Sequence, residues 1–331
     1  MAHVSHTGDG ADGVTRSDGV TPGPAIGVDV GGTRIKAGRV DADGAVCERT
    51  VVDVGSERSE AEIVARIAQV VRALDPEGAL PVGVAAAGVI DHDAGCVRES
   101  PNFPSWRDFA LAERVAAATG RAVWLENDAN AVVYGEAIAG AGRGARSLVG
   151  YTLGTGVGGG LVLDGRIWRG QRGMAGELGH VTVAPTGRPC GCGNHGCLEQ
   201  YAGQVGIRRS MRERGGHLAE LSLDRDAPLR LAELARADDV EARAVFAELG
   251  AYLGLAAASL IHTLDVTVIL LCGGIAAASE LFVPAMQAEL RARTFKSMSA
   301  GVEIRVGTLG ANAGIVGAAA VAKGCDRLRA G

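Results

Sequence analysis

Residues 152–168 read Thr-Leu-Gly-Thr-Gly-Val-Gly-Gly-Gly-Leu-Val-Leu-Asp-Gly-Arg-Ile-Trp, and this stretch distinguishes between two kinds of nucleotide-binding fold. The glycines at 154, 156 and 159 match the spacing of a dinucleotide fingerprint, which requires a helix directly after the glycines. Apolar residues on both sides of Asp164-Gly165 instead predict a β-hairpin. The pattern excludes a nicotinamide-binding loop and favours a phosphate-binding loop between two strands, with a glycine-rich hairpin that binds nothing as the alternative.

A similar glycine loop lies near the start of the chain. The apolar run Ala25–Val30 predicts a strand, and Asp29-Val-Gly-Gly-Thr33 stands at its end. Paired glycines allow backbone N–H groups to turn toward an anion, and Asp29 could hold a hydrated Mg²⁺. Asp-Gly-Gly turns are common at strand ends, so this loop alone is a weak signal. A third glycine pair, Gly273-Gly274, follows another predicted strand, 266–271.

The composition indicates an ordinary folded protein. The chain has 331 residues, of which 47% are hydrophobic and 21% charged, enough to bury a sizeable core. A net charge of −5 provides no basic face for nucleic acid or a membrane. The apolar run near Val266–Cys272 is far too short to span a bilayer. Met1–Pro24 lacks the apolar stretch of a secretory signal, so we expect a cytoplasmic protein.

Strand, glycine loop, hairpin and then alternating helix and strand occur twice along the chain, which predicts two α/β halves facing a cleft. Helices are expected from Ser59, which begins a capping-box pattern, and over 106–119, 129–139 and 281–293. The expected organisation is a disordered leader (1–24), a small α/β domain (25–141) joined by a C-terminal helix (313–331), and a large α/β domain (142–312).

Glu126-Asn-Asp-Ala-Asn130 lies where a predicted strand ends and a helix begins. An aspartate at that place is most often a helix N-cap. Between phosphate loops, however, a carboxylate at the end of a strand can accept the proton of a hydroxyl that attacks a γ-phosphate. We therefore interpret Asp128 as a general base.

Three cysteines at 190, 192 and 197 form a cluster with metal-ligand spacing, and the glycines at 191, 193 and 196 allow the loop to wrap around an ion. With one imidazole they would complete a closed tetrahedral zinc site. His180 and His195 are rival fourth ligands, and three buried thiols without metal are the alternative. The remaining cysteines, Cys47, Cys96, Cys272 and Cys325, are interpreted as structural thiols.

The motifs together resemble the superfold shared by sugar kinases, actin and heat-shock ATPases. More narrowly, over residues 25–323 the chain resembles the ROK family (repressors, open reading frames and kinases), in particular its ATP-dependent glucokinases. The motifs that carry this resemblance are Asp29-x-Gly-Gly-Thr33, Glu126-Asn-Asp-Ala-Asn-Ala131, Gly154-Thr-Gly-x-Gly-Gly-Gly160, Glu177-Leu-Gly-His180 and Cys190-Gly-Cys-Gly-Asn-His-Gly-Cys-Leu-Glu199.

The resemblance implies a two-domain, duplicated actin-like fold with an interdomain cleft, and transfer of the γ-phosphoryl group of ATP to the 6-hydroxyl of glucose. It implies Asp128 as the base, Mg²⁺ near Asp29, a structural Zn²⁺ on His180, Cys190, Cys192 and Cys197, and a homodimer or homotetramer. The sugar would be bound by Asn102, Asn127, Asp128, Glu177, His180 and Glu199. The ATP phosphates and nucleoside would be held by Asp29, Gly31, Gly32, Thr33, Gly154, Thr155, Gly156, Gly273 and Gly274.

Two alternatives share these motifs. A kinase for N-acetylmannosamine, N-acetylglucosamine or allose would carry the same phosphate and metal residues, although Ala86-Ala-Gly88 and Glu126-Asn-Asp128 are closer to the glucokinases. A sugar-responsive repressor would carry a helix-turn-helix domain before the first strand, where only 24 residues stand here. Arg34 stands where many relatives have lysine, which leaves the phosphate contact there open.

Overall fold

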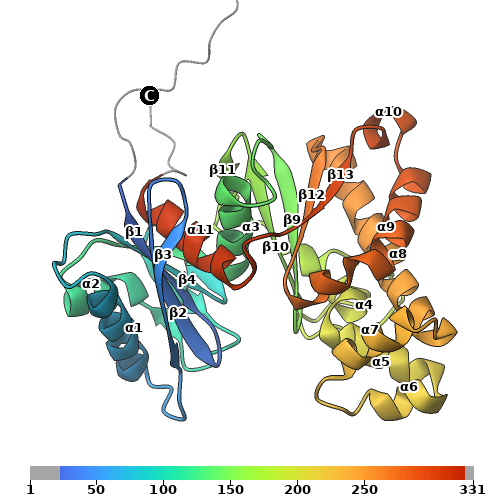
Figure 1. The fold of residues 1–331 in the computed structure, drawn as a ribbon, viewed down its shortest axis with the longest axis horizontal. Helices are drawn as coiled ribbons and strands as arrows, with labels where there is room; N and C mark the ends of the chain where they lie inside the picture. Colours follow the sequence, from blue (N-terminus) through green and yellow to red (C-terminus); the bar gives the residue numbers. More distant parts are fainter. Residues whose placement is uncertain (1–22, 325–331) are drawn as a thin grey trace, which may run out of the picture.

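The structure is a computed structural model that describes residues 23–324. The expected leader, 1–24, lies almost wholly outside these residues, as do residues 325–331 of the expected C-terminal helix. Two five-stranded sheets, each with its own helices, stand side by side (Figure 1).

The first sheet has the strand order β3-β2-β1-β4-β8. Its first three strands form an antiparallel meander, whereas β1, β4 and β8 run parallel, so their carboxyl ends meet at one edge. The strands are β1 (Ala25–Val30), β2 (Arg34–Val40), β3 (Val46–Asp53), β4 (Val82–Ala86) and β8 (Val123–Asn127).

The second sheet repeats that plan with the order β11-β10-β9-β12-β13. Its antiparallel and parallel pairs follow in the same sequence as in the first sheet. The predicted duplication of the fold and the hairpin around Asp164-Gly165 are therefore confirmed. The strands are β9 (Leu148–Leu153), β10 (Val157–Leu163), β11 (Arg166–Ile167), β12 (Val268–Cys272) and β13 (Glu303–Val306).

Each sheet has helices of its own. On the first sheet, α1 (Glu60–Leu74) begins at the predicted cap, where Ser59 Oγ accepts the Glu62 N–H at 3.3 Å, and it packs beside α2 (Leu111–Thr119). The helices beside the second sheet are α4 (Glu199–Ala202), α5 (Gln204–Arg214), α6 (Gly216–Leu221), α7 (Ala227–Arg236), α8 (Val240–Leu264), α9 (Ser279–Arg293) and α10 (Lys296–Ser299). Short 3₁₀ turns lie at η1 (Leu178–His180), η2 (Gly274–Ala278) and η3 (Gly310–Asn312).

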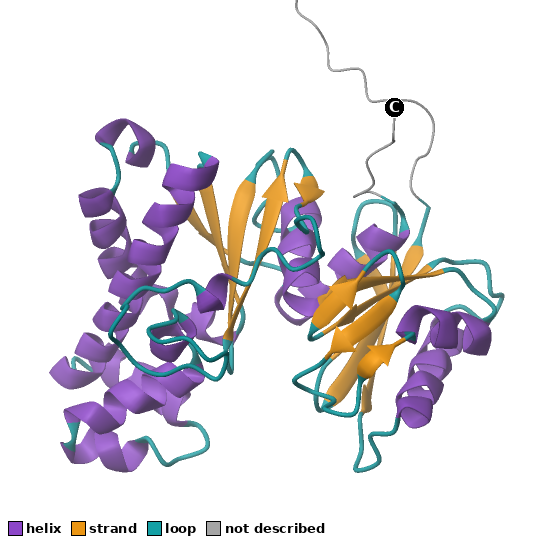
Figure 2. Ribbon diagram, turned by 180° about the vertical axis from the view of Figure 1, so that it is seen from behind, coloured by secondary structure: helices purple, strands orange, loops and turns teal. Residues whose placement is uncertain are grey.

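Two helices lie between the sheets and are exchanged between them (Figures 1 and 2). α3 (Asp128–Ala139) follows the first sheet but packs on β9 and β10, whereas α11 (Ala313–Ala322) follows the second sheet but packs on β1 and β4. Glycine allows these contacts to be close: a Cβ on Gly83 would lie 1.8 Å from the carbonyl oxygen of Ala318. α11 thus packs as part of the first sheet's core.

The helix predicted over 106–119 is wrong at its beginning. Residues Arg107–Phe109 form strand β7, which pairs with β6 (Cys96–Glu99), and β6 pairs with β5 (Val89–Asp91) in a small sheet that we did not predict. The Trp106 ring stacks on Phe103 at 4.2 Å between centroids, so its apolar surface belongs to a loop-anchoring cluster and not to a helix face.

α8 is long and apolar enough to cross a membrane by length and composition. It packs along α9 and against α7, and the side chains that it buries, among them Phe246, Leu249 and Leu253, belong to the core beside the second sheet. Its hydrophobicity is therefore explained as that of a core helix.

Candidate active site

A cleft of about 1040 Å³ lies between the two sheets, where the carboxyl ends of β4, β8 and β9 come together. Asn102, Asn127 and Asp128 line it from the side of the first sheet. From the side of the second sheet it is lined by Gly154, Thr155, Gly156, Glu177, His180, Glu199 and Gly273. The structure thus brings together residues from four of the five motifs, together with Asn102 and Gly273, although all of these are far apart in the sequence.

The glycine loop 154–156 is the tight turn between β9 and β10, closed by a bond from Gly154 N–H to the Gly156 carbonyl at 3.0 Å. The Glu199 carboxylate supports it, because Glu199 Oε2 accepts the Val157 N–H at 3.1 Å. A Cβ on Gly156 would lie 2.2 Å from that oxygen, so the approach requires glycine. No helix follows the loop, which agrees with the rejection of a dinucleotide fingerprint.

The first glycine loop lies beside this cleft, and its residues are not part of the cavity lining. Asp29 at the end of β1 forms an ion pair with Lys36, the residue directly opposite on β2, with 2.8 Å between Oδ2 and Nζ. Gly32 lies against the Asn102 side chain, and Thr33 is exposed. Arg34, in contrast, is exposed and turns to Asp53 at 3.7 Å. From the sequence we considered Arg34 as the cation at this loop and did not predict the role of Lys36. The signal was available, because the alternation of the strand places Lys36 on the same face as Asp29.

Asn127, and not Asp128, is the N-cap of α3. Asn127 Oδ1 accepts the N–H groups of Ala129 and Asn130 at 2.9 and 3.1 Å, and its Nδ2 donates to the Gly88 carbonyl at 3.1 Å. The Asn127 side chain therefore keeps one N–H for a ligand. Asp128 is freed from capping and is the first residue of the helix, facing the cleft.

Burial in the cleft, together with the negative charge of Asp29 and a smaller contribution from Glu177, raises the pKa of Asp128 to about 6. Its neighbour at the helix start, the Ala129 N–H, donates to Oδ1 at 2.9 Å and partly opposes this shift. A carboxylate with a pKa near 6 is ionised at neutral pH and still basic enough to accept a proton.

Glu177, His180 and Glu199 all line the cavity from the side of the second sheet. Glu177 is exposed to the cleft and stands directly before η1, which ends with His180. Glu199 Oε1 has no bond to the glycine loop, so it can accept from a ligand hydroxyl while Oε2 holds Val157 N–H. Two carboxylates and an imidazole in one cavity suit a polyhydroxylated ligand.

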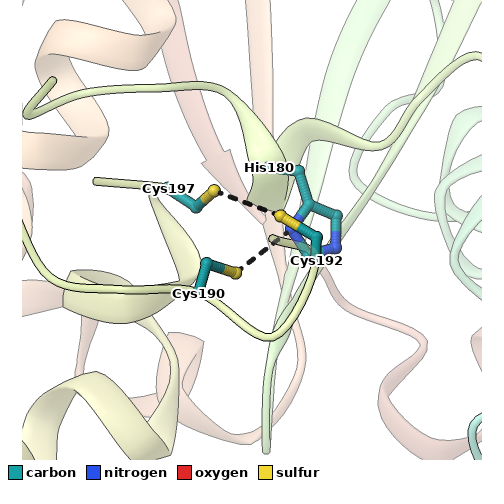
Figure 3. Close-up of side chains that lie close together, drawn as sticks. All are labelled: His180, Cys190, Cys192 and Cys197. Carbon is teal, nitrogen blue, oxygen red and sulfur yellow. Dashed lines mark hydrogen bonds between the residues drawn. The ribbon is translucent and has the colours of Figure 1, made fainter. Parts of the chain in front are cut away.

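His180, Cys190, Cys192 and Cys197 form a compact cluster in which all four candidate ligand atoms lie within 4.8 Å of one another (Figure 3). His180 Nδ1 lies 3.6 Å from Cys190 Sγ, and Cys192 Sγ lies 3.6 Å from Cys197 Sγ. A tetrahedral zinc ion with bonds to sulfur of about 2.3 Å would hold its sulfur ligands about 3.8 Å apart. His195 is exposed and stands outside this group, so the geometry favours His180 among the two rivals.

Electrostatics within this cluster agree with a cation site. Burial and the adjacent thiols raise the pKa of Cys197 to about 12, whereas the Asn194 backbone N–H and the neighbouring thiols lower the pKa of Cys192. Three thiols at this distance cannot all ionise unless a cation lies between them.

Two buried carboxylates at the ends of α3 were not given a role from the sequence. Glu126, fully buried, bonds to Arg169, and hydrogen bonds from His92 and the charge of Arg169 outweigh burial, so the pKa of Glu126 lies below its usual value. Glu136, nearly as buried, accepts backbone N–H groups from two loops. A charged residue within an apolar helix was the available signal for Glu136.

Comparison with known proteins agrees with this geometry. Residues 25–325 match the ROK family. The glucokinase of Thermotoga maritima is 38% identical over 307 residues, which cover 90% of this chain and 96% of that protein. A ROK hexokinase structure from Thermus thermophilus (TM-score 0.76, 34% identity) covers 89% of this chain and 96% of its own.

A further solved structure, a ROK family glucokinase from Streptomyces griseus in complex with glucose and AMPPNP, superimposes with a TM-score of 0.74. It is 33% identical, and the match covers 91% of this chain and all of that one. The duplicated halves are thus those of the sugar-kinase fold, as the sequence predicted. Because the match spans nearly all of the described residues, the chain belongs to the ROK family.

Proposed function

We propose that this protein is an ATP-dependent glucokinase in which Asp128 is the general base. The observation that supports this most directly is a carboxylate with a pKa near 6 at the end of a parallel strand, in a cleft that faces a glycine loop. The three relatives reported above are two glucokinases and a hexokinase, and their likeness along most of the chain favours the same substrate class here.

In the proposed reaction the 6-hydroxyl of glucose attacks the γ-phosphorus of ATP and passes its proton to Asp128. The bond between the γ-phosphorus and the bridging oxygen breaks, and ADP leaves with that electron pair. Asp128 is suited to this role because its side chain is partly desolvated. Asn127 caps the helix, so the Asp128 carboxylate is not needed for capping.

The phosphates of ATP would be bound by backbone N–H groups of the two glycine loops. Gly273-Gly274 would lie against the nucleoside. Asp29, at a strand end beside the cleft, is an oxygen ligand of the kind that Mg²⁺ prefers, and a bound Mg²⁺ would neutralise the charge that develops on the phosphates. Lys36 holds the Asp29 carboxylate in place and provides a cation at the same loop.

Sugar hydroxyls would be bound by the carboxylates of Glu177 and Glu199, by the ring of His180 and by the amides of Asn102 and Asn127. The cysteine cluster would hold a structural zinc ion on His180, Cys190, Cys192 and Cys197, which the sulfur separations suit. With four protein ligands this ion would leave no open position for chemistry. It would instead fix His180 and the segment that leads into Glu199.

We also propose a division into a small domain (25–141 with α11) and a large domain (142–312), which the close packing of α11 on β1 and β4 supports. A cytoplasmic location and a homodimer or homotetramer are proposed from the resemblance to the ROK glucokinases.

A coupled assay of ADP release across a hexose panel tests the proposal. Glucose should give the highest kcat/KM and galactose a value at least about tenfold lower, because an unpaired buried acceptor costs roughly 1–3 kcal/mol. A preference for an N-acetylhexosamine would overturn the glucokinase assignment and keep the kinase, whereas no activity on any hexose would overturn both.

A further inference from the structure

Glu126 is the first residue of the motif Glu126–Asn130, and the proposed reaction gives its carboxylate no role. It is the fourth residue of β8, directly before the cap Asn127 and the base Asp128. Its side chain is fully buried, and a buried carboxylate is expensive unless it is both paired and hydrogen-bonded.

The Glu126 carboxylate meets three segments of the chain. Oε1 accepts the Asn127 N–H at 2.9 Å and Asn130 Nδ2 at 3.0 Å, and His92 Nε2 lies 3.0 Å away. Oε2 receives the Arg169 fork, with Nε at 2.7 Å and the terminal nitrogen at 2.5 Å. Because two nitrogens of the guanidinium group contact the same oxygen, the edge of this group is directed at Oε2.

The partners of Glu126 come from both sides of the cleft. His92 follows β5, beside the first sheet, whereas Arg169 follows β11 of the second sheet. From Arg169 the chain turns back, with a bond from Ala175 N–H to the Arg169 carbonyl at 2.9 Å, and then reaches Glu177. This turn also touches the first side, because a Cβ on Gly173 would lie 2.7 Å from the Ile90 carbonyl oxygen.

One carboxylate therefore connects the start of α3, which carries Asp128, to the turn that carries Glu177. We propose that Glu126 and Arg169 form a positioning ion pair that holds the base of the reaction in register with the sugar-binding glutamate on the opposite side of the cleft. Neither residue needs to touch substrate. The inference rests on the proposed function and adds two residues to its machinery.

The test compares Glu126→Gln with Asp75→Asn, a matched control. Asp75 forms a buried ion pair of its own with Arg121 at 3.1 Å, between the end of α1 and the residues before β8, away from the cleft lining. Both variants should lower the melting temperature. Only Glu126→Gln should raise the glucose KM and lower kcat, each by about tenfold or more, with the ATP KM within about twofold.

A double variant, Glu126→Gln with Arg169→Gln, should have a kcat/KM for glucose no lower than that of the less active single variant, because the two residues act as a unit. If Glu126→Gln does not fold, Arg169→Lys keeps the charge and removes the fork, and the same split between sugar and ATP constants is expected.

Suppose that the wild-type protein is active and that Glu126→Gln has the same kinetic constants as Asp75→Asn. This result would overturn the inference and leave the proposed function intact. Additive losses in the double variant would overturn the inference as well. A wild-type protein that phosphorylates no hexose would overturn the proposed function and the inference with it, so the two failures are distinguishable.

Discussion

Asp128 has the clearest conflict between stability and catalysis at the scale of single residues. Its raised pKa means that the native state favours the protonated form, so the charge it carries at pH 7 opposes folding. Asp128→Asn should therefore lower kcat by at least about 10²-fold and raise the free energy of unfolding at pH 7 by on the order of 1 kcal/mol. ADP release and urea unfolding measure the two effects. Near-normal turnover would remove Asp128 from the mechanism.

The pKa of Asp128 also predicts a pH dependence. In the native state this carboxyl binds its proton below about pH 6, whereas an unfolded aspartate does so only near pH 3.9. The kcat/KM for glucose should fall about tenfold per pH unit below pH 6, since the base is then protonated. The contribution of Asp128 to stability should rise over the same interval as the pH falls from 6 to 4. A profile that stays flat down to pH 4.5 would contradict this assignment.

What the sequence could predict at this scale depended on the kind of signal. Asp128 and the cysteine cluster stand in short local motifs, so their neighbourhood was visible in the sequence. Lys36 pairs with Asp29, which is only seven residues away, and the alternation of the strand was the available signal for it. Glu126 and Glu136, in contrast, act through partners far away in the chain: Arg169 lies 43 residues from Glu126, and Leu309 lies 173 residues from Glu136. Pairs of that kind are created by the fold, and spacing along the chain carries no information about them.

At the scale of elements, α3 is held to both connections between the sheets by Glu136. Oε2 accepts the Ala141 N–H at 2.9 Å and the Thr308 N–H at 3.0 Å, and Oε1 accepts the Leu309 N–H at 2.7 Å. Residues 140–147 and 307–312 are the segments that lead from one sheet to the other. An amide at this position would turn a donor toward these N–H groups.

Glu136→Gln should therefore lower the free energy of unfolding by about 2–4 kcal/mol, because at least one buried donor loses its partner. Glu48→Gln is the matched control: Glu48 pairs with Arg39 at 4.0 Å on the exposed face of β3, and its loss should stay within about 0.5 kcal/mol. Chemical denaturation of the two variants gives the comparison. Equal losses of unfolding free energy in the two variants would show that the hydrogen bonds of Glu136 do not stabilise the fold more than an exposed ion pair does.

The loop between η1 and α4 depends on its metal in the proposed function. Cys192→Ser should lose zinc, lower the stability of this loop and raise the glucose KM by at least about tenfold, while the ATP KM changes less. Cys47→Ser is the control, because Cys47 is exposed on β3 outside the cluster. Elemental analysis and kinetics measure the outcome. Active wild-type enzyme that contains no zinc would contradict the metal site.

Among the elements, those with a strong local pattern could be predicted. The glycine loops, the hairpin of β10 and β11 and the capped helix α1 all follow from turn and cap chemistry. The sheet β5-β6-β7 could not be predicted, because its strands are three or four residues long and lie among polar residues. The spacing of Trp106 and Phe109, three residues apart, matched the periodicity of a helix face and led to the wrong prediction. In the structure these rings pack together with Phe103.

At the scale of the whole molecule, the exchange of α3 and α11 makes the two halves dependent on each other. α11 supplies buried residues beside the first sheet although it follows the second, and α3 does the reverse. Neither half, as a continuous segment, contains its complete core. Unfolding by heat should therefore be one cooperative transition, seen alike by near-UV and far-UV circular dichroism.

Glucose should shift this whole transition, because the residues proposed to bind it lie on both sides of the cleft. A ligand that binds only the native state stabilises it by about 2.7 kcal/mol at 100 times its dissociation constant. In the melting experiment glucose should raise the single midpoint, whereas galactose at the same concentration should leave it nearly unchanged. Two separate transitions, of which glucose moves only one, would show that the halves fold independently and that one of them binds the sugar alone.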